Sequence, residues 1–439
     1  MTGSWHIDRL RVQNFRQYEA LSVDFGSEVT LLIGENGAGK TAVLDAIATL
    51  LSTVLADQKH GGKNLRHVDA RVVPSDLDYL QRAATIESAY PVIVEGEGEL
   101  DGATFQWART IRSPSNRPTL GSRDVREFSS GLINRAVKAR ELTDAVVLPV
   151  IAYYGVERLV GERRAQGDIP VSQRGAYHSA LDPRSDLKRL FTFLRNLDNQ
   201  ILRAQAYGDE NPLAARRQFE AIEKACELIL SPVGWRRMRW NDSINGLTLT
   251  HGTHGTLPLS MLATGPRIAA GLAIDLASRM ARANPHLGGE DLLCSTPGIV
   301  LIDEVDLHLH PSWQQQIVPL LRKTFPRVQF ILTTHSPQVI STVEAKNIRI
   351  LNGTEASTPE FAEGLRSNVV LETLQGVDPA PPTRSRRMLE HYMRLVSAGD
   401  GSSVQAVELR QEVERELGGP GLNPELLKAD VALAFEGWD

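Results

Sequence analysis

Residues 29–41 constrain the fold more than any other part of the chain. An uninterrupted aliphatic and β-branched run, VTLLI, occupies residues 29–33 and is typical of a strand buried in a parallel sheet. The loop that follows reads GENGAGKT, and apolar residues then recur at three- and four-residue intervals up to residue 54, which predicts a helix. A strand, a glycine-rich loop and a helix in direct succession indicate an α/β fold.

This loop matches the pattern G-x-x-x-x-G-K-[ST], which predicts a phosphate-binding site. In such loops successive backbone N–H groups and the helix N-terminus point at the phosphates. We expect the Lys40 side chain to reach the β- and γ-phosphates and the Thr41 hydroxyl to coordinate Mg²⁺. The cofactors predicted here are therefore ATP and Mg²⁺. The loop residues expected to bind the nucleotide are Gly34, Glu35, Asn36, Gly37, Ala38, Gly39, Lys40 and Thr41.

Two further apolar runs end in polar residues that suit the same site. Residues 298–304 read GIVLIDE, so Asp303 is a candidate Mg²⁺ ligand and Glu304 a candidate catalytic residue that polarises the attacking water. Residues 333–336 read TTHS at the end of the next run, and His335 is a candidate catalytic residue that senses the γ-phosphate. Parallel strands end at one sheet edge, where ligands of open α/β folds bind.

Composition excludes several classes of protein. The chain has 48 Lys and Arg against 53 Asp and Glu, which argues against a generally basic nucleic-acid binder. Its two cysteines, Cys226 and Cys294, form no CxxC motif, so neither a disulfide scaffold nor a Cys-rich zinc module is expected. No signal-peptide pattern or bilayer-length apolar stretch occurs, so we expect a cytoplasmic protein that does not contact membranes.

Changes in composition along the chain suggest four segments. We expect a first lobe with the phosphate loop over residues 1–155, a helical insertion over 156–240, a second lobe over 241–355 and an acidic helical segment over 356–439. The insertion has 15 Lys and Arg against 11 Asp and Glu, and it either contacts DNA or is simply solvated. The last segment has 8 basic and 14 acidic residues, and it either docks a basic partner or folds onto its own head.

Together, these motifs resemble the ATP-binding-cassette (ABC) ATPase superfamily. The resemblance is to its soluble branch, which contains the structural-maintenance-of-chromosomes, Rad-fifty, RecF and overcoming-lysogenization-defect proteins. It implies an ABC-type P-loop NTPase head, in which a mixed-sheet lobe adjoins a parallel-sheet core. It also implies nucleotide contacts from Arg16, in the start motif LRVQNFR, and from Asp306, in the D-loop that follows Glu304. His308 and His310 can be read as a zinc pair, but their spacing is also that of the D-loop pattern.

The signature motif departs from the family pattern. Its best match is LATGPR at residues 262–267, with Ala263 where the family has serine. In the family, this motif closes over the γ-phosphate held by a second subunit, so the resemblance implies nucleotide contacts from Thr264 and Gly265. It also implies slow hydrolysis because the serine hydroxyl is missing. The glutamine that usually follows the first lobe has no match near residues 153–158.

Four stretches are similar to the PtuA-type ATPases of Septu anti-phage systems and to related retron ATPases. They are residues 148–155, 275–285, 306–313 and 333–342. This resemblance implies a head-to-head dimer or higher oligomer and a separate HNH nuclease partner of the PtuB type. The segment after His335 lacks the Asp-x-Asp pattern of a Toprim nuclease, so no nuclease activity of its own is expected. Two alternatives remain open, namely a RecF-like DNA repair ATPase and a nucleotide-sensing scaffold that does not hydrolyse ATP.

Overall fold

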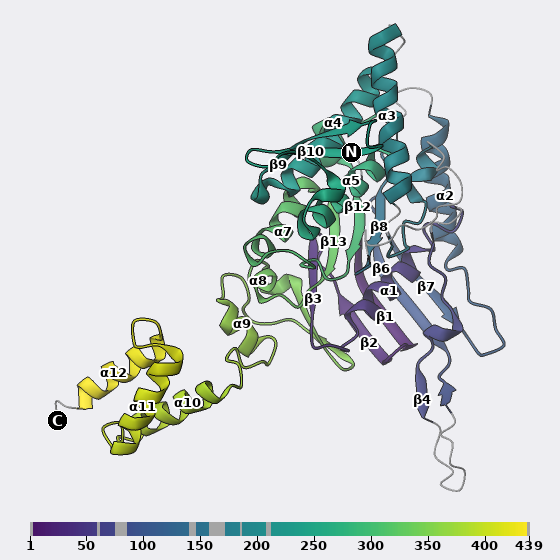
Figure 1. Ribbon diagram of the computed structural model, residues 1–439. Coiled ribbons are helices and arrows are strands. Elements are labelled where there is room, and N and C mark those ends of the chain that lie inside the picture. Colours follow the sequence, from purple (N-terminus) through teal and green to yellow (C-terminus); the bar gives the residue numbers. More distant parts are fainter. Residues whose placement is uncertain are drawn as a thin grey trace. The chain divides into compact units, whose positions relative to one another are not determined.

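The structure is a computed structural model in which the chain forms two compact units, Met1–Val370 and Leu371–Asp439. Figure 1 shows both units. The described residues are 3–58, 62–74, 86–139, 146–157, 172–184, 187–207 and 212–436.

A six-stranded sheet forms the centre of the larger unit (Figure 1). Five of its strands are parallel, and β15 is antiparallel to its neighbour. Every residue of β3, β8, β12 and β13 is buried, as the continuous apolar runs predict. The strand order is β15 (Glu355–Ser357), β14 (Ile348–Asn352), β3 (Val29–Ile33), β13 (Val328–Thr333), β12 (Gly298–Ile302) and β8 (Val150–Tyr154).

Three antiparallel sheets accompany this core. The largest has the order β2-β1-β6-β7, the second has the order β11-β10-β9, and β4 pairs with β5. Together with the parallel core, they confirm the predicted α/β class. The strands are β1 (Trp5–Phe15), β2 (Tyr18–Asp24), β4 (Val72–Pro74), β5 (Ile86–Ser88), β6 (Val92–Leu100), β7 (Ala103–Ile111), β9 (Trp235–Asn241), β10 (Gly246–His251) and β11 (Gly255–Pro258).

Helix α1 (Lys40–Leu51) packs against strands of both large sheets. All of its residues except Thr41 are buried, which is expected of a helix enclosed on every side. Gly96 on β6 permits the close approach, because a Cβ atom there would lie 2.1 Å from Leu50 Cδ2. The indole N–H of Trp107 donates to the Leu50 carbonyl, 3.0 Å away. The phosphate loop therefore lies at the start of the most enclosed helix in this core.

The larger unit contains further helices, and the last of them, α9 (Ser367–Thr373), crosses its boundary at Val370. The predicted insertion at 156–240 contains two long helices, α3 and α4, but it ends in strand β9, and residues 158–171 lie outside the described residues. The predicted junction between residues 355 and 356 falls inside β15, and the compact unit continues to Val370. The helices are α2 (Arg123–Lys138), α3 (Leu187–Tyr207), α4 (Pro212–Ile229), α5 (Thr264–Ala283), α6 (Glu290–Ser295), α7 (Pro311–Thr324), α8 (Pro337–Ile340) and α9 (Ser367–Thr373).

The smaller unit is a three-helix arrangement with a core of its own. Its helices are α10 (Arg384–Ser397), α11 (Val404–Leu417) and α12 (Pro424–Glu436). Leu389, Tyr392 and Leu426 are among the buried residues of this core. Arg410 joins the helices, since its guanidinium donates to the Asp430 carboxylate at 2.8 and 3.2 Å and to the Tyr392 hydroxyl at 3.1 Å. Among the helices that the structure describes, none has the length and apolarity that crossing a bilayer requires.

Candidate nucleotide site

The glycine-rich loop is shaped by close contacts with the turn between β1 and β2. Gly39 has φ of 90°, and a Cβ atom there would lie 1.9 Å from Gln17 Nε2 and 2.2 Å from the Tyr18 hydroxyl. Gln17 Nε2 donates to the Gly37 carbonyl at 3.2 Å, and the Tyr18 hydroxyl donates to the Ala38 carbonyl at 2.6 Å. Only glycine fits at position 39, because both the backbone conformation and the space exclude a side chain.

Lys40 begins α1 and is only 7% exposed. Its ammonium donates to the carbonyls of Gly34, at 2.9 Å, and Glu35, at 3.0 Å, so the side chain lies along the loop. Burial lowers the pKa of Lys40, while the nearby carboxylates of Asp303 and Glu304 act in the opposite direction. The loop, the lysine and two carboxylates from the end of β12 thus form one electrostatic cluster.

Asp303 is fixed by hydroxyl groups from two other elements. It follows β12, is 4% exposed, and accepts hydrogen bonds from Thr41 Oγ1 at its Oδ2 (2.8 Å) and from Thr333 Oγ1 at its Oδ1 (2.6 Å). Its backbone N–H donates to the carbonyl of Tyr154 on β8, 2.8 Å away. The structure therefore brings the predicted Mg²⁺ ligands Thr41 and Asp303 together, although 262 residues separate them.

This pair of oxygen donors suits Mg²⁺, which prefers carboxylate, hydroxyl, water and phosphate oxygens. No cluster of three or more His, Cys, Asp or Glu side chains that could hold a metal occurs among the described residues. A P-loop magnesium ion does not need one, because phosphates and waters supply most of its ligands. The donor set of Thr41 and Asp303 therefore fits the predicted ion.

The residues after Asp303 are held by the end of strand β13. Glu304 has φ of 47°, and its backbone N–H donates to Thr333 Oγ1 at 2.7 Å. The Thr334 hydroxyl donates to Asp306, and it accepts a hydrogen bond from the Ser336 N–H at 2.9 Å. The catalytic candidate Glu304 and the D-loop candidate Asp306 are thus positioned by two consecutive threonines.

His335 belongs to the same charged cluster. Burial lowers its pKa, the positive charge of Lys40 lowers it further, and the charges of Glu304, Asp306 and Asp303 oppose both effects. All of these side chains lie close enough to influence the imidazole. The structure therefore groups His335 with Lys40 and the three acidic residues at the carboxyl edge of the parallel sheet.

The signature candidates lie against the D-loop. Thr264 and Gly265 begin α5, and a Cβ atom at Gly265 would lie 2.6 Å from the His308 carbonyl oxygen. Thr264 is exposed, and Ala263 supplies no side-chain cap to the helix. The ring nitrogen of His310 instead accepts from the Ser312 N–H at the start of α7, as a helix cap does. This contact favours the D-loop interpretation of the histidine pair over the zinc interpretation.

Arg16 lies beside α1 and contacts Asp45, which is one helical turn after Thr41. Its guanidinium contacts Asp45 and approaches Asp69 Oδ1 at 3.5 Å. Lys63 also contacts Asp45, so two cations share this carboxylate, and burial lowers the pKa of Lys63. Sequence reasoning named Arg16 but missed its partners, because neither Asp45 nor Lys63 belongs to a recognisable motif.

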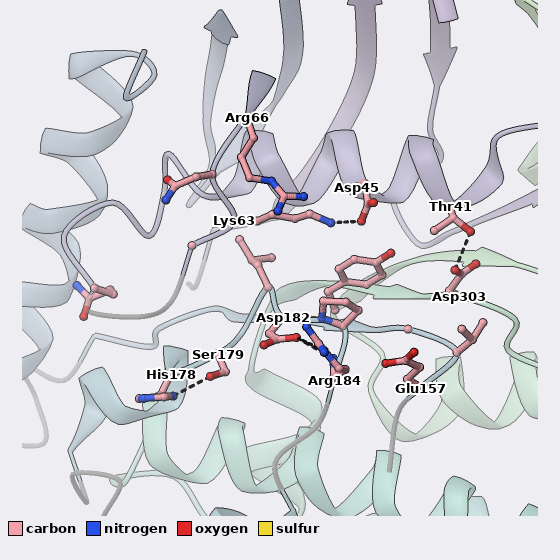
Figure 2. Close-up of a pocket in the computed structure, with 18 of the residues that line it drawn as sticks. Thr41, Asp45, Lys63, Arg66, Glu157, His178, Ser179, Asp182, Arg184 and Asp303 are labelled. Atoms are coloured by element: carbon pink, nitrogen blue, oxygen red, sulfur yellow. Dashed lines mark hydrogen bonds and ion pairs between the residues drawn. The ribbon is translucent and has the colours of Figure 1, made fainter. Parts of the chain in front are cut away.

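A polar cavity of about 1470 Å³ opens beside this cluster. Figure 2 shows Lys63 directed at Asp45 and Thr41 facing Asp303 along the cavity wall. Tyr153 contributes an aromatic surface, with the Lys63 ammonium 5.3 Å from the ring centroid. The cavity reaches the candidate metal ligands from the side of α1, whereas Lys40 does not line it.

Hydrogen bonds from a buried arginine on α5 position the opposite wall of the cavity. Arg279 on α5 donates to Asp275 Oδ2 at 2.8 Å and to the carbonyls of Ala176, at 3.0 Å, and His178, at 3.2 Å. The hydroxyl of Tyr154 donates to the same carboxylate oxygen at 2.8 Å. Burial opposes ionisation of Asp275, but Arg279 and Arg282 hold its pKa below the usual value. This network links the cavity wall to the strand beside Asp303.

Two family models match parts of the chain. The family described as "AAA domain" matches residues 9–231. The chain belongs to this AAA-domain family. A second family, described as "AAA domain, putative AbiEii toxin, Type IV TA system", matches residues 158–341.

Two curated relatives are a retron ATPase and a Septu protein. The chain is 28% identical to the retron Ec83 probable ATPase of Escherichia coli, with 95% of this chain and 84% of that protein covered. It is 25% identical to the Septu protein PtuA of Bacillus mycoides, over 75% of this chain and 38% of that protein. The SMC head domain of Thermotoga maritima aligns at a TM-score of 0.44 and 16% identity, covering 81% of this chain and 99% of that one. The predicted resemblance to retron and Septu ATPases is confirmed.

We expect the imidazole of His335 to titrate below its ordinary pKa of 6.5. The folded state disfavours the imidazolium, so this contribution to stability is complete above pH 6.5 and is lost as the pH falls. Histidine chemical shifts, assigned with a His335→Gln variant and followed by NMR against pH, measure the midpoint. In a Lys40→Met variant the midpoint should move upward, because the neighbouring positive charge is gone. An unchanged midpoint would contradict the proximity of the two groups.

Proposed function

We propose that this chain is an ATPase of a bacterial anti-phage defence complex, which pairs with a second copy through bound nucleotide and controls a separate HNH nuclease of the PtuB type. The observation that carries the proposal is the contact between Thr41 and Asp303 beside the Lys40 loop. Phosphate-binding backbone, a lysine and two oxygen donors for Mg²⁺ meet at one sheet edge, which is the arrangement that phosphoryl transfer requires. The retron and Septu relatives support the defence context.

Each residue of the cluster has a distinct role in this proposal. Lys40 leaves the loop carbonyls to neutralise the β- and γ-phosphates. Thr41 and Asp303 would hold Mg²⁺, which would supply positive charge beside the phosphate oxygens. Glu304 orients and polarises the attacking water. His335, kept neutral by burial and by Lys40, donates a hydrogen bond to the γ-phosphate.

The same proposal assigns Thr264, Gly265 and Asp306 to the nucleotide of a second copy. Thr264 is exposed at the start of α5, and Gly265 packs on the backbone that follows Asp306. A helix N-terminus with an exposed hydroxyl suits an anion presented by a partner. Two heads would therefore be joined by ATP bound between them, and the missing serine hydroxyl at Ala263 would slow hydrolysis.

A non-hydrolysing nucleotide sensor is the second candidate. Ala263 favours it, because the N-terminus of α5 has no side-chain cap and no serine hydroxyl to offer to a γ-phosphate. In that case nucleotide binding alone would pair the heads and signal to the partner.

Replacing Lys40 with alanine should weaken ATP binding by about 100-fold or more, because two charge-assisted hydrogen bonds to phosphate are lost. Affinity for a fluorescent ATP analogue measures this effect. Lys346→Ala is the matched control, since this lysine is 73% exposed and pairs with Glu344 at the surface. Unchanged affinity in the Lys40 variant would refute a nucleotide site at this loop.

Replacing Glu304 with glutamine distinguishes the ATPase from the sensor. If Glu304 activates water, phosphate release should fall by about 100-fold or more while ATP binding persists. Light scattering should then detect a doubled mass with ATP, because the paired state no longer decays. Equal, near-zero rates for the wild type and the variant would favour the sensor, and a monomer at saturating ATP would contradict nucleotide-driven pairing.

The partner proposal is tested by capturing the chain from its native cells. A small HNH protein should co-purify with the full chain. A variant that ends at Asp378, after α9, tests the acidic unit, whose core is formed by the helices that follow. Loss of the HNH protein with that variant supports docking on residues 379–439, whereas its retention supports docking on the head. Absence of any HNH protein in both captures would overturn the partner assignment.

A further inference from the structure

The hydroxyl of Thr333 forms hydrogen bonds with two consecutive acidic residues, Asp303 and Glu304. Thr333 is the last residue of β13, and it is fully buried. A buried hydroxyl is costly unless it is hydrogen-bonded. This hydroxyl has two partners on the neighbouring strand end, the Asp303 carboxylate and the Glu304 backbone N–H.

The direction of these hydrogen bonds follows from the atoms involved. The Glu304 N–H can only donate, so the Thr333 oxygen accepts from it at 2.7 Å. The single hydroxyl hydrogen of Thr333 is then left for Asp303 Oδ1, at 2.6 Å. Thr41 holds the other carboxylate oxygen, at 2.8 Å. Asp303 is thus oriented by one hydroxyl on each oxygen, from α1 on one side and from β13 on the other.

The Thr334 hydroxyl forms a hydrogen bond with a different carboxylate. This hydroxyl donates to Asp306, in the D-loop. Consecutive strand-end residues point in opposite directions, so the two threonines divide these contacts between them. Glu304 adopts φ of 47°, an unfavourable conformation for a residue with a side chain, and its N–H is held by Thr333.

We infer that Thr333 is a positioning residue that sets the affinity of the nucleotide site for Mg²⁺ by orienting the carboxylate of Asp303. This inference rests on the proposed function, because Asp303 must be a ligand of the ion. Partners that orient a metal-binding side chain without touching the metal usually matter about 10- to 100-fold for metal affinity. The Thr333 hydroxyl binds residues that follow β12 and not the phosphate loop, so nucleotide affinity without the ion should not depend on it.

The experiment compares Thr333→Val with Thr333→Ser in the full chain. Valine preserves the shape and removes the hydroxyl, whereas serine preserves the hydroxyl. Affinity for a fluorescent ATP analogue is measured in EDTA and then across an Mg²⁺ titration. For Thr333→Val we expect unchanged affinity in EDTA and an Mg²⁺ midpoint raised about 10- to 100-fold. For Thr333→Ser we expect a midpoint close to that of the wild type.

Thr324→Val is the matched control. Thr324 lies in the same unit and is buried, but its hydroxyl has no hydrogen-bond partner within the described part of the chain. Loss of that hydroxyl should leave the Mg²⁺ midpoint unchanged. An equal shift in both valine variants would attribute the effect to packing and overturn the inference, as would an unchanged midpoint in Thr333→Val.

The experiment distinguishes failure of the proposed function from failure of the inference about Thr333. If the wild type binds no nucleotide in either condition, the proposed function fails and the inference fails with it. If the wild type binds nucleotide with Mg²⁺ dependence and only the Thr333 prediction fails, the proposed function stands. Should Thr333→Val not fold, Thr333→Cys replaces it, and this weaker donor should raise the midpoint by an intermediate amount, whereas no rise would overturn the inference.

Discussion

The candidate site depends on the two hydroxyl hydrogen bonds that fix the Asp303 carboxylate. Thr41 begins α1, after the phosphate loop, and Thr333 ends β13, so their contacts with Asp303 join three separate parts of the chain. Hydrogen bonds to a charged group contribute about 1.5–3 kcal/mol each. They form only if β3, β13 and β12 are neighbours with their carboxyl ends at the same edge, which is the order observed. The parallel arrangement of these strands is therefore a requirement for both contacts.

A second buried network supports this edge from the opposite side. Asp275 and Arg279 on α5 are almost completely buried, and removing one partner of such a pair costs about 3–5 kcal/mol. Through Tyr154, whose carbonyl accepts the Asp303 N–H, the pair connects α5 with the strand end at the candidate metal ligand. Arg279 also donates to the carbonyls of Ala176 and His178, so α5 connects the signature candidates and the cavity wall with the sheet edge that carries Asp303.

The predictions that succeeded depend on local sequence. The run at residues 29–33 and the run at 298–302 are both buried parallel strands, because an unbroken apolar run is the direct requirement of a strand covered on both faces. The contacts that local sequence did not predict join distant residues. Gln17 lies in a turn and Tyr18 begins β2, and only folding brings them to the Gly37 and Ala38 carbonyls. Thr333 was visible in the TTHS motif, yet its two partners follow another strand, β12.

The sequence alone was sufficient to predict the phosphate loop, the acidic strand end and the α/β class. Each of these features is encoded within about ten consecutive residues by periodicity and glycine placement. The sequence also contained the family resemblance, since motif spacing is a property of the chain. Only the tertiary structure decided that Thr41 and Asp303 touch, that Arg16 shares Asp45 with Lys63, and that Gly265 packs on His308. The physical reason is that these contacts join residues far apart in the chain, and their geometry follows from strand order and helix packing, which local patterns do not specify.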